Sequence, residues 1–557
     1  MSATLVEVLR RRLEEDPDRT ACWLVGPDGR SQPVTWRRLM ARAGDWARAF
    51  GKPPPGPDRP IAAICSYPGP DLHAAFLGAL WSGWIPAFLA PPSPRMDRVK
   101  FEASFRAILR HVRPACLVLD AASAERLGPA LADPGGARIL GSAGVPAQGG
   151  PMPEPWPATP GDIAVLQHSS GTTGLQKGVA LSHRAILAHH HAYAKVLGIG
   201  AQDCVATWLP LYHDMGLMAC FLMPLIEGVP FVEIPTFDWV LRPWSLMEKI
   251  QEHRATLCWL PNFAFALLAR TARDRGVTPG LDVSSVRAWI SCSEFVMASS
   301  QRAFLDAYGP SGVSQDRLSA SYAMAETVFA ATQARPGSRR VLRVDRRALD
   351  TELRIAEPST GPSIDLVSSG PVLPTLIIEV RDPAGRALPQ GHLGEIHLRG
   401  EHLFSGYFRR PDLTAEAMTP DGSYRTGDLG LLQDGEVYVT GRLKDLVIIQ
   451  GRNLHPSDIE AAAASAPGVI PGRVAAIGIA DEESGSERLV ILAEAEPGSV
   501  GVEMGIRRAL VREMDLSAGE VRLVPERWLV KSTSGKMARA DIRRKWLAER
   551  TGGRAHP

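Results

Sequence analysis

Residues 167–178 read Gln167-His168-Ser169-Ser170-Gly171-Thr172-Thr173-Gly174-Leu175-Gln176-Lys177-Gly178, a loop rich in glycine and hydroxyl side chains. Such a loop is suited to binding phosphates, because glycine lets backbone N–H groups approach an anion, hydroxyls donate hydrogen bonds and lysine supplies positive charge. It is not a Walker loop, in which glycine directly precedes the lysine, because Gln176 stands at that position. The alternative for this stretch taken alone is an ordinary surface turn.

The residues on either side of the loop predict a strand and a helix. The apolar run Ile163–Leu166 before it is typical of a buried strand. After it, Ser182 is a suitable N-cap for a helix from His183 to about Leu197. The loop therefore lies between regular elements.

Length and composition limit the class of protein. A chain of 557 residues is expected to hold more than one domain. Its hydrophobic content of 45% and charged content of 22% are typical of a soluble globular protein. A formal net charge of +2 predicts no general attraction to nucleic acid. No apolar run approaches the roughly 18 residues of a membrane span, and the first residues do not look like a signal peptide.

Cysteine and histidine usage predicts neither disulfides nor zinc. The seven cysteines are scattered and contain no C-x-x-C pair, as expected of buried thiols in a reducing compartment, so we expect a cytoplasmic location. The run His189–His191 lies on a predicted helix without the i, i+4 spacing of a metal pair, and we expect no zinc site there.

Strands and helices alternate in the first part of the chain, which favours doubly wound α/β layers. The expected elements are a helix at Leu5–Leu13, a strand at Ala21–Val25, a helix at Thr35–Phe50, a strand at Ile61–Cys65, a helix at Leu72–Trp81 and a strand at Ala115–Leu119. Residues 132–160, rich in glycine and proline, are expected to form a linker.

Three further stretches carry candidate chemistry. In Trp208–Leu217, Tyr212 and His213 precede an apolar helix, although a lone histidine is more often structural than catalytic. Ala288–Phe295 is expected to be a strand that ends in a loop of small residues. In Ser321–Thr327, Tyr322 is suited to stacking on a base and Glu326 to holding Mg²⁺. The alternative for Glu326 is a solvated surface charge.

The last third of the chain makes the pattern specific. Tyr424–Gly430 is followed by the turn Asp434-Gly435-Glu436, then by Gly441-Arg442-Leu443-Lys444-Asp445, by Gly451–Glu460, and by the loop Lys531-Ser532-Thr533-Ser534-Gly535-Lys536. In this order these motifs resemble the adenylate-forming (acyl-activating) superfamily, and more narrowly the fatty acyl-AMP ligases. The resemblance extends from about Leu5 to about Trp546.

The resemblance implies an α/β fold in two unequal parts. Residues 1–440 would form a large N-terminal adenylation domain of α/β layers plus a small β-barrel-like subdomain, with subdomains at approximately 1–160, 161–330 and 331–440. Residues 441–557 would form a small mobile α+β C-terminal domain that carries the catalytic lysine.

The resemblance also implies the residues of the site, with ATP and Mg²⁺ as cofactors. The phosphates of ATP would be held by Ser169, Ser170, Gly171, Thr172, Thr173, Gly174 and Lys177. The rest of the nucleotide would lie near Ser293, Glu294, Ser321, Tyr322 and Thr327, with Asp428 on the ribose and Arg442 on the ribose or phosphate. The catalytic residues would be Lys536, His213 and Glu326, with Glu326 also the Mg²⁺ ligand. Lys444 would be the hinge between the domains, and Lys536 would bridge the carboxylate and the α-phosphate.

The acid predicted to be activated is apolar. Asp214 is displaced from the aspartate position of amino-acid-activating relatives, which argues against an amino-acid substrate and for a fatty acid. The apolar run Trp259–Leu268 is suited to a tunnel wall, although a packed core helix has the same pattern. Three positions depart from the family pattern, namely Gln176, Phe295 and Ala323.

The acceptor predicted from the resemblance is a phosphopantetheine thiol. Arg452-Asn453 and Asp458-Ile459-Glu460 resemble acyl-AMP ligases. Val341–Leu353 resembles the insertion that, in these ligases, lies against the C-terminal domain and hinders the use of CoA; the alternative is a surface loop of alternating charge. We therefore expect a holo-acyl carrier protein, free-standing or in a polyketide or nonribosomal peptide synthase, with no nucleic-acid partner and no stable insertion into a membrane.

Other functions remain open at this point. The alternative acceptor is CoA, which would make the protein a fatty acyl-CoA ligase. A nonenzymatic scaffold would have lost catalytic groups that are present here, and kinase-like phosphoryl transfer would yield ADP in place of AMP and pyrophosphate.

Overall fold

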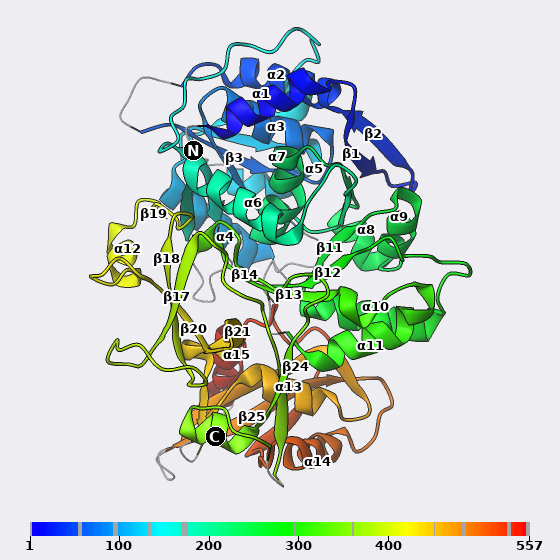
Figure 1. The fold of residues 1–557 in the computed structure, drawn as a ribbon, viewed down its shortest axis with the longest axis vertical. Coiled ribbons are helices and arrows are strands. Elements are labelled where there is room, and N and C mark those ends of the chain that lie inside the picture. Colours follow the sequence, from blue (N-terminus) through cyan, green and yellow to red (C-terminus); the bar gives the residue numbers. More distant parts are fainter. Residues whose placement is uncertain are drawn as a thin grey trace.

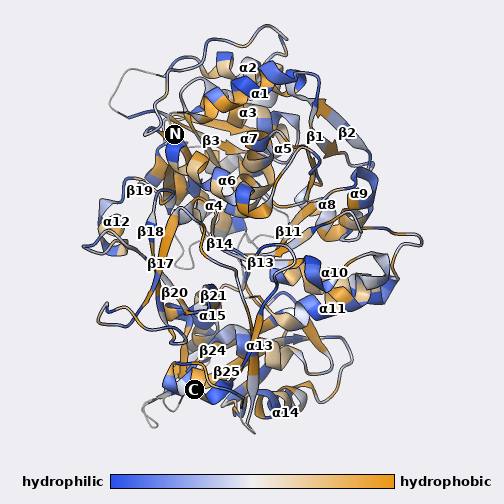
Figure 2. Ribbon diagram, in the orientation of Figure 1, coloured by the Kyte–Doolittle hydropathy of each residue, from blue (hydrophilic) through white to orange (hydrophobic). Residues whose placement is uncertain are grey.

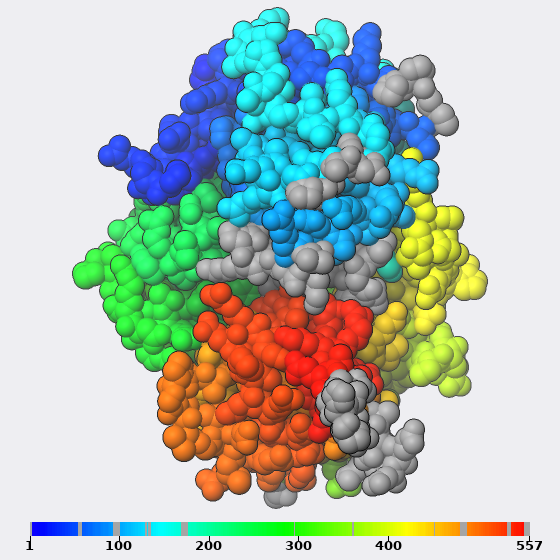
Figure 3. Space-filling model, turned by 180° about the vertical axis from the view of Figure 1, so that it is seen from behind, coloured from blue at the N-terminus to red at the C-terminus, as the bar shows by residue number. Residues whose placement is uncertain are grey.

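The computed structural model describes residues 3–53, 58–92, 98–131, 135–168, 177–293, 296–358, 361–449, 452–481, 486–531 and 536–552. A large N-terminal region fills most of the view, and a smaller C-terminal part lies below it (Figure 1). Seen from behind, the orange-to-red C-terminal part lies under both the blue and the green parts of the chain (Figure 3). Among the described residues, no helix is both long enough and apolar enough to cross a bilayer.

The largest sheet has eight strands in the order β14-β13-β12-β11-β9-β10-β1-β2. These are β1 (Thr20–Val25), β2 (Ser31–Thr35), β9 (Val205–Thr207), β10 (Phe231–Glu233), β11 (Leu257–Leu260), β12 (Ala288–Ser291), β13 (Leu318–Ala323) and β14 (Ala330–Gln333). The six inner strands run parallel to one another, and the edge strands β2 and β14 run antiparallel to β1 and β13. Most residues of the inner strands are buried and apolar, as expected of a parallel sheet that is covered on both sides. Figure 2 shows the hydropathy of the chain in the same view.

A second parallel sheet, in the order β4-β3-β5-β6, and a small antiparallel sheet, β19-β8-β7, complete the layers of the N-terminal region. Their strands are β3 (Ile61–Cys65), β4 (Ile85–Phe88), β5 (Cys116–Leu119), β6 (Arg138–Gly141), β7 (Ile163–His168), β8 (Gly178–Ser182) and β19 (Gly406–Tyr407). The helices of this region are α1 (Leu5–Glu15), α2 (Trp36–Phe50), α3 (Pro70–Trp81), α4 (Arg98–Val112), α5 (Ala121–Leu127), α6 (His183–Leu197), α7 (Met223–Glu227), α8 (Thr236–Leu241), α9 (Ser245–His253), α10 (Asn262–Arg275), α11 (Ala298–Tyr308) and α12 (Pro411–Ala417).

Where the chain approaches the C-terminal part, it forms a four-stranded antiparallel sheet and a two-stranded ribbon. The sheet has the order β17-β18-β20-β21, and the ribbon joins β15 to β16. The strands are β15 (Val341–Asp345), β16 (Ser363–Val367), β17 (Leu376–Arg381), β18 (Gly394–Gly400), β20 (Tyr424–Gln433) and β21 (Glu436–Arg442). The predicted turn at Asp434-Gly435 joins β20 to β21, with both residues at positive φ.

The C-terminal part begins after a short 3-10 turn, Leu443–Asp445. It contains β22 (Val447–Ile449), β23 (Arg452–Leu454), α13 (Pro456–Ala464), β24 (Val469–Asp481), β25 (Ser486–Ala495), α14 (Val502–Met514), β26 (Glu520–Val524) and α15 (Arg539–Gly552). Two apolar clusters lie within it, one between the sheet and α13 and α14, the other beneath α15 around Ile542 and Trp546. Its residues therefore pack mainly on one another.

The fold class predicted from the sequence is confirmed: the chain has a mixed α/β fold with a large N-terminal region and a C-terminal domain. The predicted strand–helix alternation is present in β1, α2, β3, α3 and β5, and Ser182 caps α6 by accepting a hydrogen bond from the N–H of Ala185. Residues 135–160 are not purely a linker, because β6 forms an exposed edge strand there. The boundary at residue 440 stays a prediction.

Candidate active site

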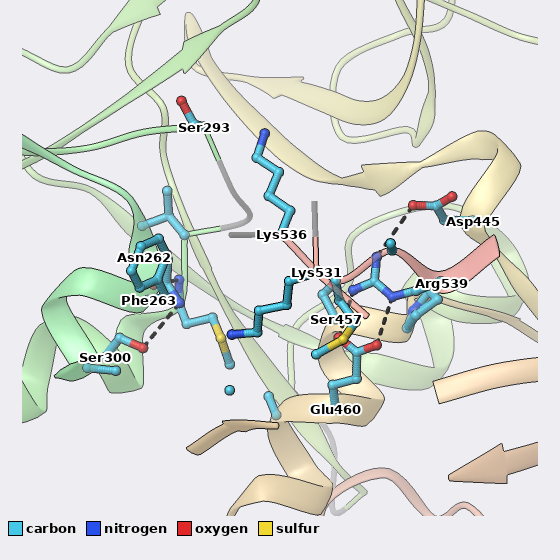
Figure 4. A pocket seen from close by; sticks show the side chains of 18 of the residues that line it. Asn262, Phe263, Ser293, Ser300, Asp445, Ser457, Glu460, Lys531, Lys536 and Arg539 are labelled. Carbon is cyan, nitrogen blue, oxygen red and sulfur yellow. Dashed lines mark hydrogen bonds and ion pairs between the residues drawn. The ribbon is translucent and has the colours of Figure 1, made fainter. Parts of the chain in front are cut away.

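A cavity of about 1020 Å³ lies between the N-terminal region and the C-terminal part. Its walls come from α10, from the ends of β12, β13 and β21, and from α13, Lys531 and residues 536–539 of the C-terminal part. Two lysines enter it from the C-terminal side: Lys536 points toward Ser293, and Lys531 points toward Asn262 and Ser300 (Figure 4).

Lys536 lies within electrostatic range of a half-buried pair of the N-terminal region, His213 and Asp214. His213 Nδ1 lies 2.7 Å from Asp214 Oδ1. Burial opposes ionisation of Asp214, but His213 and, more weakly, Lys536 outweigh it and hold the pKa of this carboxyl below its ordinary value. The predicted catalytic residues Lys536 and His213 are therefore brought to the same region, from parts of the chain more than 300 residues apart.

The segment after His213 explains how this pair is held. Residues Met215–Leu222 form a π-helix, and Asp214 accepts a hydrogen bond of 2.8 Å from the N–H of Met215. A Cβ at Gly216 would lie 2.3 Å from the carbonyl oxygen of Pro210, so only glycine permits this close approach. The sequence predicts a helix here but not its wider winding.

Asp428 forms the centre of a second group. It accepts a hydrogen bond of 2.7 Å from the hydroxyl of Tyr322, and Nε of Arg442 lies 3.0 Å from its other oxygen. The charge of Asp428 is the main reason why the pKa of Arg442 is raised. All three residues line the cavity, so three of the predicted nucleotide-binding residues, each from a different motif, lie together.

Glu326 is enclosed in a third group that includes a residue not predicted from the sequence. It accepts a hydrogen bond of 2.8 Å from the hydroxyl of Tyr407. Burial and the nearby Glu326 both raise the pKa of the Tyr407 hydroxyl, so this hydroxyl stays protonated and donates. Lys177 Nζ lies 4.4 Å from the centre of the Tyr407 ring. Tyr407 thus connects the predicted Mg²⁺ ligand to the lysine at the end of the glycine-rich loop.

The backbone next to Glu326 is strained. Val328 has φ of +66°, a value that a β-branched residue rarely adopts and that costs on the order of 1–3 kcal/mol. The turn is held by backbone hydrogen bonds from Val328 to Ala325 and from Phe404 to the carbonyl of Glu326. The surrounding structure therefore imposes the position of Glu326.

Several predicted residues lie at or near the cavity without a demonstrated contact for a ligand. Ser293, which follows β12, lines the cavity and has φ of +70°. The hydroxyl of Ser321 donates to the carbonyl of Thr332, and that of Thr327 bonds within its own turn to Met324 and Phe329. Lys444 is exposed in the turn between the two parts. Their predicted roles stay predictions.

Part of the predicted site lies outside the described residues. These residues are Ser169, Ser170, Gly171, Thr172, Thr173 and Gly174 of the phosphate loop, Glu294 of the predicted adenine site, and the departures Gln176 and Phe295.

One arm of the cavity is apolar. It is lined by Phe101 and Phe105 of α4, Trp239 of α8, and Phe263 and Leu267 of α10. The run Trp259–Leu268, predicted as a tunnel wall or a core helix, is the end of β11 followed by α10, and one face of α10 lines this arm. The arm is suited to an apolar chain.

The segment Val341–Leu353 lies against the C-terminal part. Arg346 Nη1 lies 3.2 Å from Asp458 Oδ2, and Arg452 Nη2 lies 3.1 Å from Asp350 Oδ2. In both pairs the carboxylates are buried. The segment is therefore docked and not a free surface loop.

Comparisons with known proteins agree with this geometry. The family model of AMP-binding enzymes matches residues 9–408. The long-chain-fatty-acid–AMP ligase FadD26 of Mycobacterium marinum is 30% identical over 96% of this chain and 96% of its own length. A putative acyl-CoA synthetase of Caulobacter vibrioides is 32% identical over 86% of this chain and 84% of its own length.

A solved structure from a study of fatty acyl-adenylate ligases of E. coli and L. pneumophila superimposes with a TM-score of 0.88 and 25% identity, covering 99% of this chain and 98% of that one. The family match covers well over half of the sequence, and Tyr322, Asp428, Arg442 and Lys536, from four of the motifs that carry the resemblance, line one cavity. The chain therefore belongs to the family of AMP-binding enzymes, and it is a ligase of the adenylate-forming type.

Proposed function

We propose that the protein joins a fatty acid to AMP at the expense of ATP and then passes the acyl group to the phosphopantetheine thiol of a separate acyl carrier protein. The observation that carries the proposal is the convergence of Lys536, Asp428 with Arg442, and an apolar arm on one cavity. Relatives described as long-chain-fatty-acid–AMP ligases along almost the whole chain support it.

The first step is an in-line displacement. A carboxylate oxygen of the fatty acid attacks the α-phosphorus of ATP, the P–O bond to the β-phosphate breaks, and pyrophosphate leaves with the electron pair. Two anions must approach each other, so a cation between them lowers the barrier. Lys536 is the side chain for this role, because it enters the cavity from the C-terminal side toward Ser293.

Asp428, Tyr322 and Arg442 orient the nucleotide in this proposal. The carboxylate of Asp428 is an acceptor for ribose hydroxyls, and Tyr322 and Arg442 fix its position through hydrogen bonds of 2.7 and 3.0 Å. Mg²⁺ would supply charge neutralisation at the phosphates. The carboxylate of Glu326, buried and held by Tyr407, is of the oxygen type that Mg²⁺ prefers.

In the second step the carrier thiolate attacks the acyl carbon and AMP leaves. The two ion pairs that dock Val341–Leu353 on the C-terminal part support a carrier over CoA, because this segment resembles the insertion that hinders the use of CoA in acyl-AMP ligases. A carrier of polyketide or nonribosomal peptide type in the cytoplasm is the partner we propose.

Pyrophosphate release from ATP tests the first step. It is expected to depend on an added fatty acid and to yield acyl-AMP, and release of ADP would contradict the proposal. For the second step, enzyme, ATP, Mg²⁺ and fatty acid with CoA should give little acyl-CoA, whereas holo-carrier protein should become acylated. Rapid acyl-CoA formation by the wild-type protein would instead make it an acyl-CoA ligase.

A further inference from the structure

Arg539, at the start of α15, holds two carboxylates at once. Its Nε and Nη2 each lie 2.7 Å from one oxygen of Glu460, a bidentate pair with α13. Its Nη1 lies 3.5 Å from Asp445, in the turn between the two parts of the chain. Figure 4 shows Arg539 between these two acids, on the same wall of the cavity as Lys536.

The base of the loop that carries Lys536 is fixed on both sides. Lys531 and Met537 form an antiparallel bridge, and the N–H of Ala538 donates to the carbonyl of Val530. Arg539 follows directly, three residues after Lys536, so their Cα atoms are at most about 11 Å apart. A shift of Arg539 is therefore transmitted to Lys536.

The contact with Asp445 extends this clamp to the turn between the two parts. On the N-terminal side of the turn, Arg442 pairs with Asp428. On the other side, Asp445 pairs with Arg539. Only Leu443 and Lys444 lie between these two ion pairs.

We propose that Arg539 is a positioning residue that couples the turn at Lys444 to the placement of Lys536 in the cavity. The inference rests on the role of Lys536 in the proposed function. Arg539 acts through the loop base and touches no reacting atom. When the C-terminal part rotates, the ion pairs that Arg539 forms with Asp445 and Glu460 cause Leu443–Asp445, α13 and Lys536 to move together as one rigid body.

A purely stabilising role would need only the pair with Glu460. Glu460 also accepts a hydrogen bond of 3.1 Å from the N–H of Ala476, which remains when Arg539 is lost. Ile542 and Trp546 anchor α15 in its apolar cluster independently of Arg539. The fold is therefore expected to survive the loss of Arg539, while Lys536 is displaced. A displacement of about 1 Å lowers the rate by about 100-fold.

The test compares Arg539→Met with Arg543→Met, the same substitution at an exposed position of the same helix. For pyrophosphate release, Arg539→Met should lower kcat by about 100-fold and leave KM for ATP within about twofold, because Asp428 and Tyr322 are untouched. Carrier acylation from supplied acyl-AMP should fall much less. Arg539→Lys, which keeps the charge but not the fork, should recover part of the lost rate.

Asp445→Asn provides the second arm. As a single substitution, Asp445→Asn should lower kcat for pyrophosphate release. Added to Arg539→Met, Asp445→Asn should cause no further fall in kcat, because both substitutions break the same coupling. Equal kcat in the Arg539→Met and Arg543→Met proteins would overturn the inference. If Arg539→Met lowers the rates of both half-reactions equally and also lowers Tm, Arg539 only stabilises the fold and does not position Lys536.

A readout without activity separates this inference from the proposed function. Amide hydrogen exchange over residues 536–540 should be at least about tenfold faster in Arg539→Met than in Arg543→Met, since the loop base loses its clamp. Unchanged exchange would overturn the inference, whatever the enzyme does. If the wild-type protein releases no pyrophosphate with any fatty acid, the proposed function fails, and exchange alone decides whether Arg539 positions Lys536.

Discussion

The hydroxyl of Tyr407 donates a hydrogen bond of 2.8 Å to the carboxylate of Glu326, although the two residues are 81 positions apart. The same ring lies under the ammonium group of Lys177. Tyr407 therefore ties the end of the glycine-rich loop to the predicted metal ligand.

Glu326→Gln is expected to weaken the use of Mg·ATP far more than the binding of fatty acid, because the substitution removes the charge but keeps the shape and the acceptor for Tyr407. The measurement is the Mg²⁺ dependence of pyrophosphate release, with Glu357→Gln, at an exposed site, as the control. Raised Mg²⁺ should recover part of the activity. If it recovers none and fatty-acid affinity falls instead, Glu326 belongs to the acyl site.

Lys536→Ala is expected to reduce acyl-AMP formation by at least about 100-fold while the protein stays folded, because it removes the cation proposed to lie between two anions. Single-turnover formation of acyl-AMP measures this, and Lys52→Ala, at an exposed position, is the matched control. A wild-type rate of adenylation in Lys536→Ala would show that another group neutralises the charge.

Lys444→Pro is expected to keep adenylation and abolish most of the acyl transfer. Residues Leu443–Asp445 form a 3-10 turn, whose φ values of roughly −50 to −70° suit proline, so the substitution should lock the orientation seen here. That orientation directs Lys536 into the cavity. The two half-reactions are measured separately, with Lys444→Ala as the control. Unchanged rates for both would rule out a hinge at Lys444.

Asp350→Asn is expected to stabilise the protein at pH 7 to 8. Burial raises the pKa of Asp350 from 3.8 to about 6, although Arg346 and Arg452 act in the opposite direction. Between pH 3.8 and about 6, Asp350 is protonated in the folded protein but ionised in the unfolded chain. The contribution of Asp350 to stability therefore falls as the pH rises and is lost above a pH of about 6. The difference corresponds to at most about 3 kcal/mol.

Asparagine resembles the protonated acid, so the advantage of Asp350→Asn should be largest at pH 8 and shrink toward pH 5. Urea unfolding at a series of pH values measures it, with the exposed Asp306→Asn as the control. A wild-type protein that is more stable than Asp350→Asn at pH 8 would mean that the ion pair with Arg452 outweighs the cost of burial.

The sequence predicts well those parts of the site that short motifs carry. Tyr322, Asp428 and Arg442 each lie within a recognisable local pattern, and they meet at one carboxylate. The buried strands β3 and β7 are likewise predicted because their apolar runs are continuous.

Contacts between distant residues are not predicted. Tyr407 lies in no motif, and Arg539 meets Glu460 across 79 residues, so only the tertiary structure brings these partners together. The π-helical winding at Met215–Leu222 also escapes prediction, because its apolar residues fit an α-helix equally well. The docking of Val341–Leu353 depends on Asp458 and Arg452, more than 100 positions along the chain.

The two-residue turn between the ion pairs of Arg442 and Asp445 has a consequence for how the parts of the chain meet. The main apolar cluster of the N-terminal region extends to Val439, and the two clusters of the C-terminal part, which begin at Val447 and Ala475, share no residue with it. Beside the ion pairs that join the two parts, the covalent link at Leu443-Lys444 acts as a short tether. A tether of this kind keeps a partner at a roughly millimolar effective concentration. The part that carries Lys536 therefore stays close to the nucleotide site between turnovers, so no diffusional encounter between the two limits the rate of turnover.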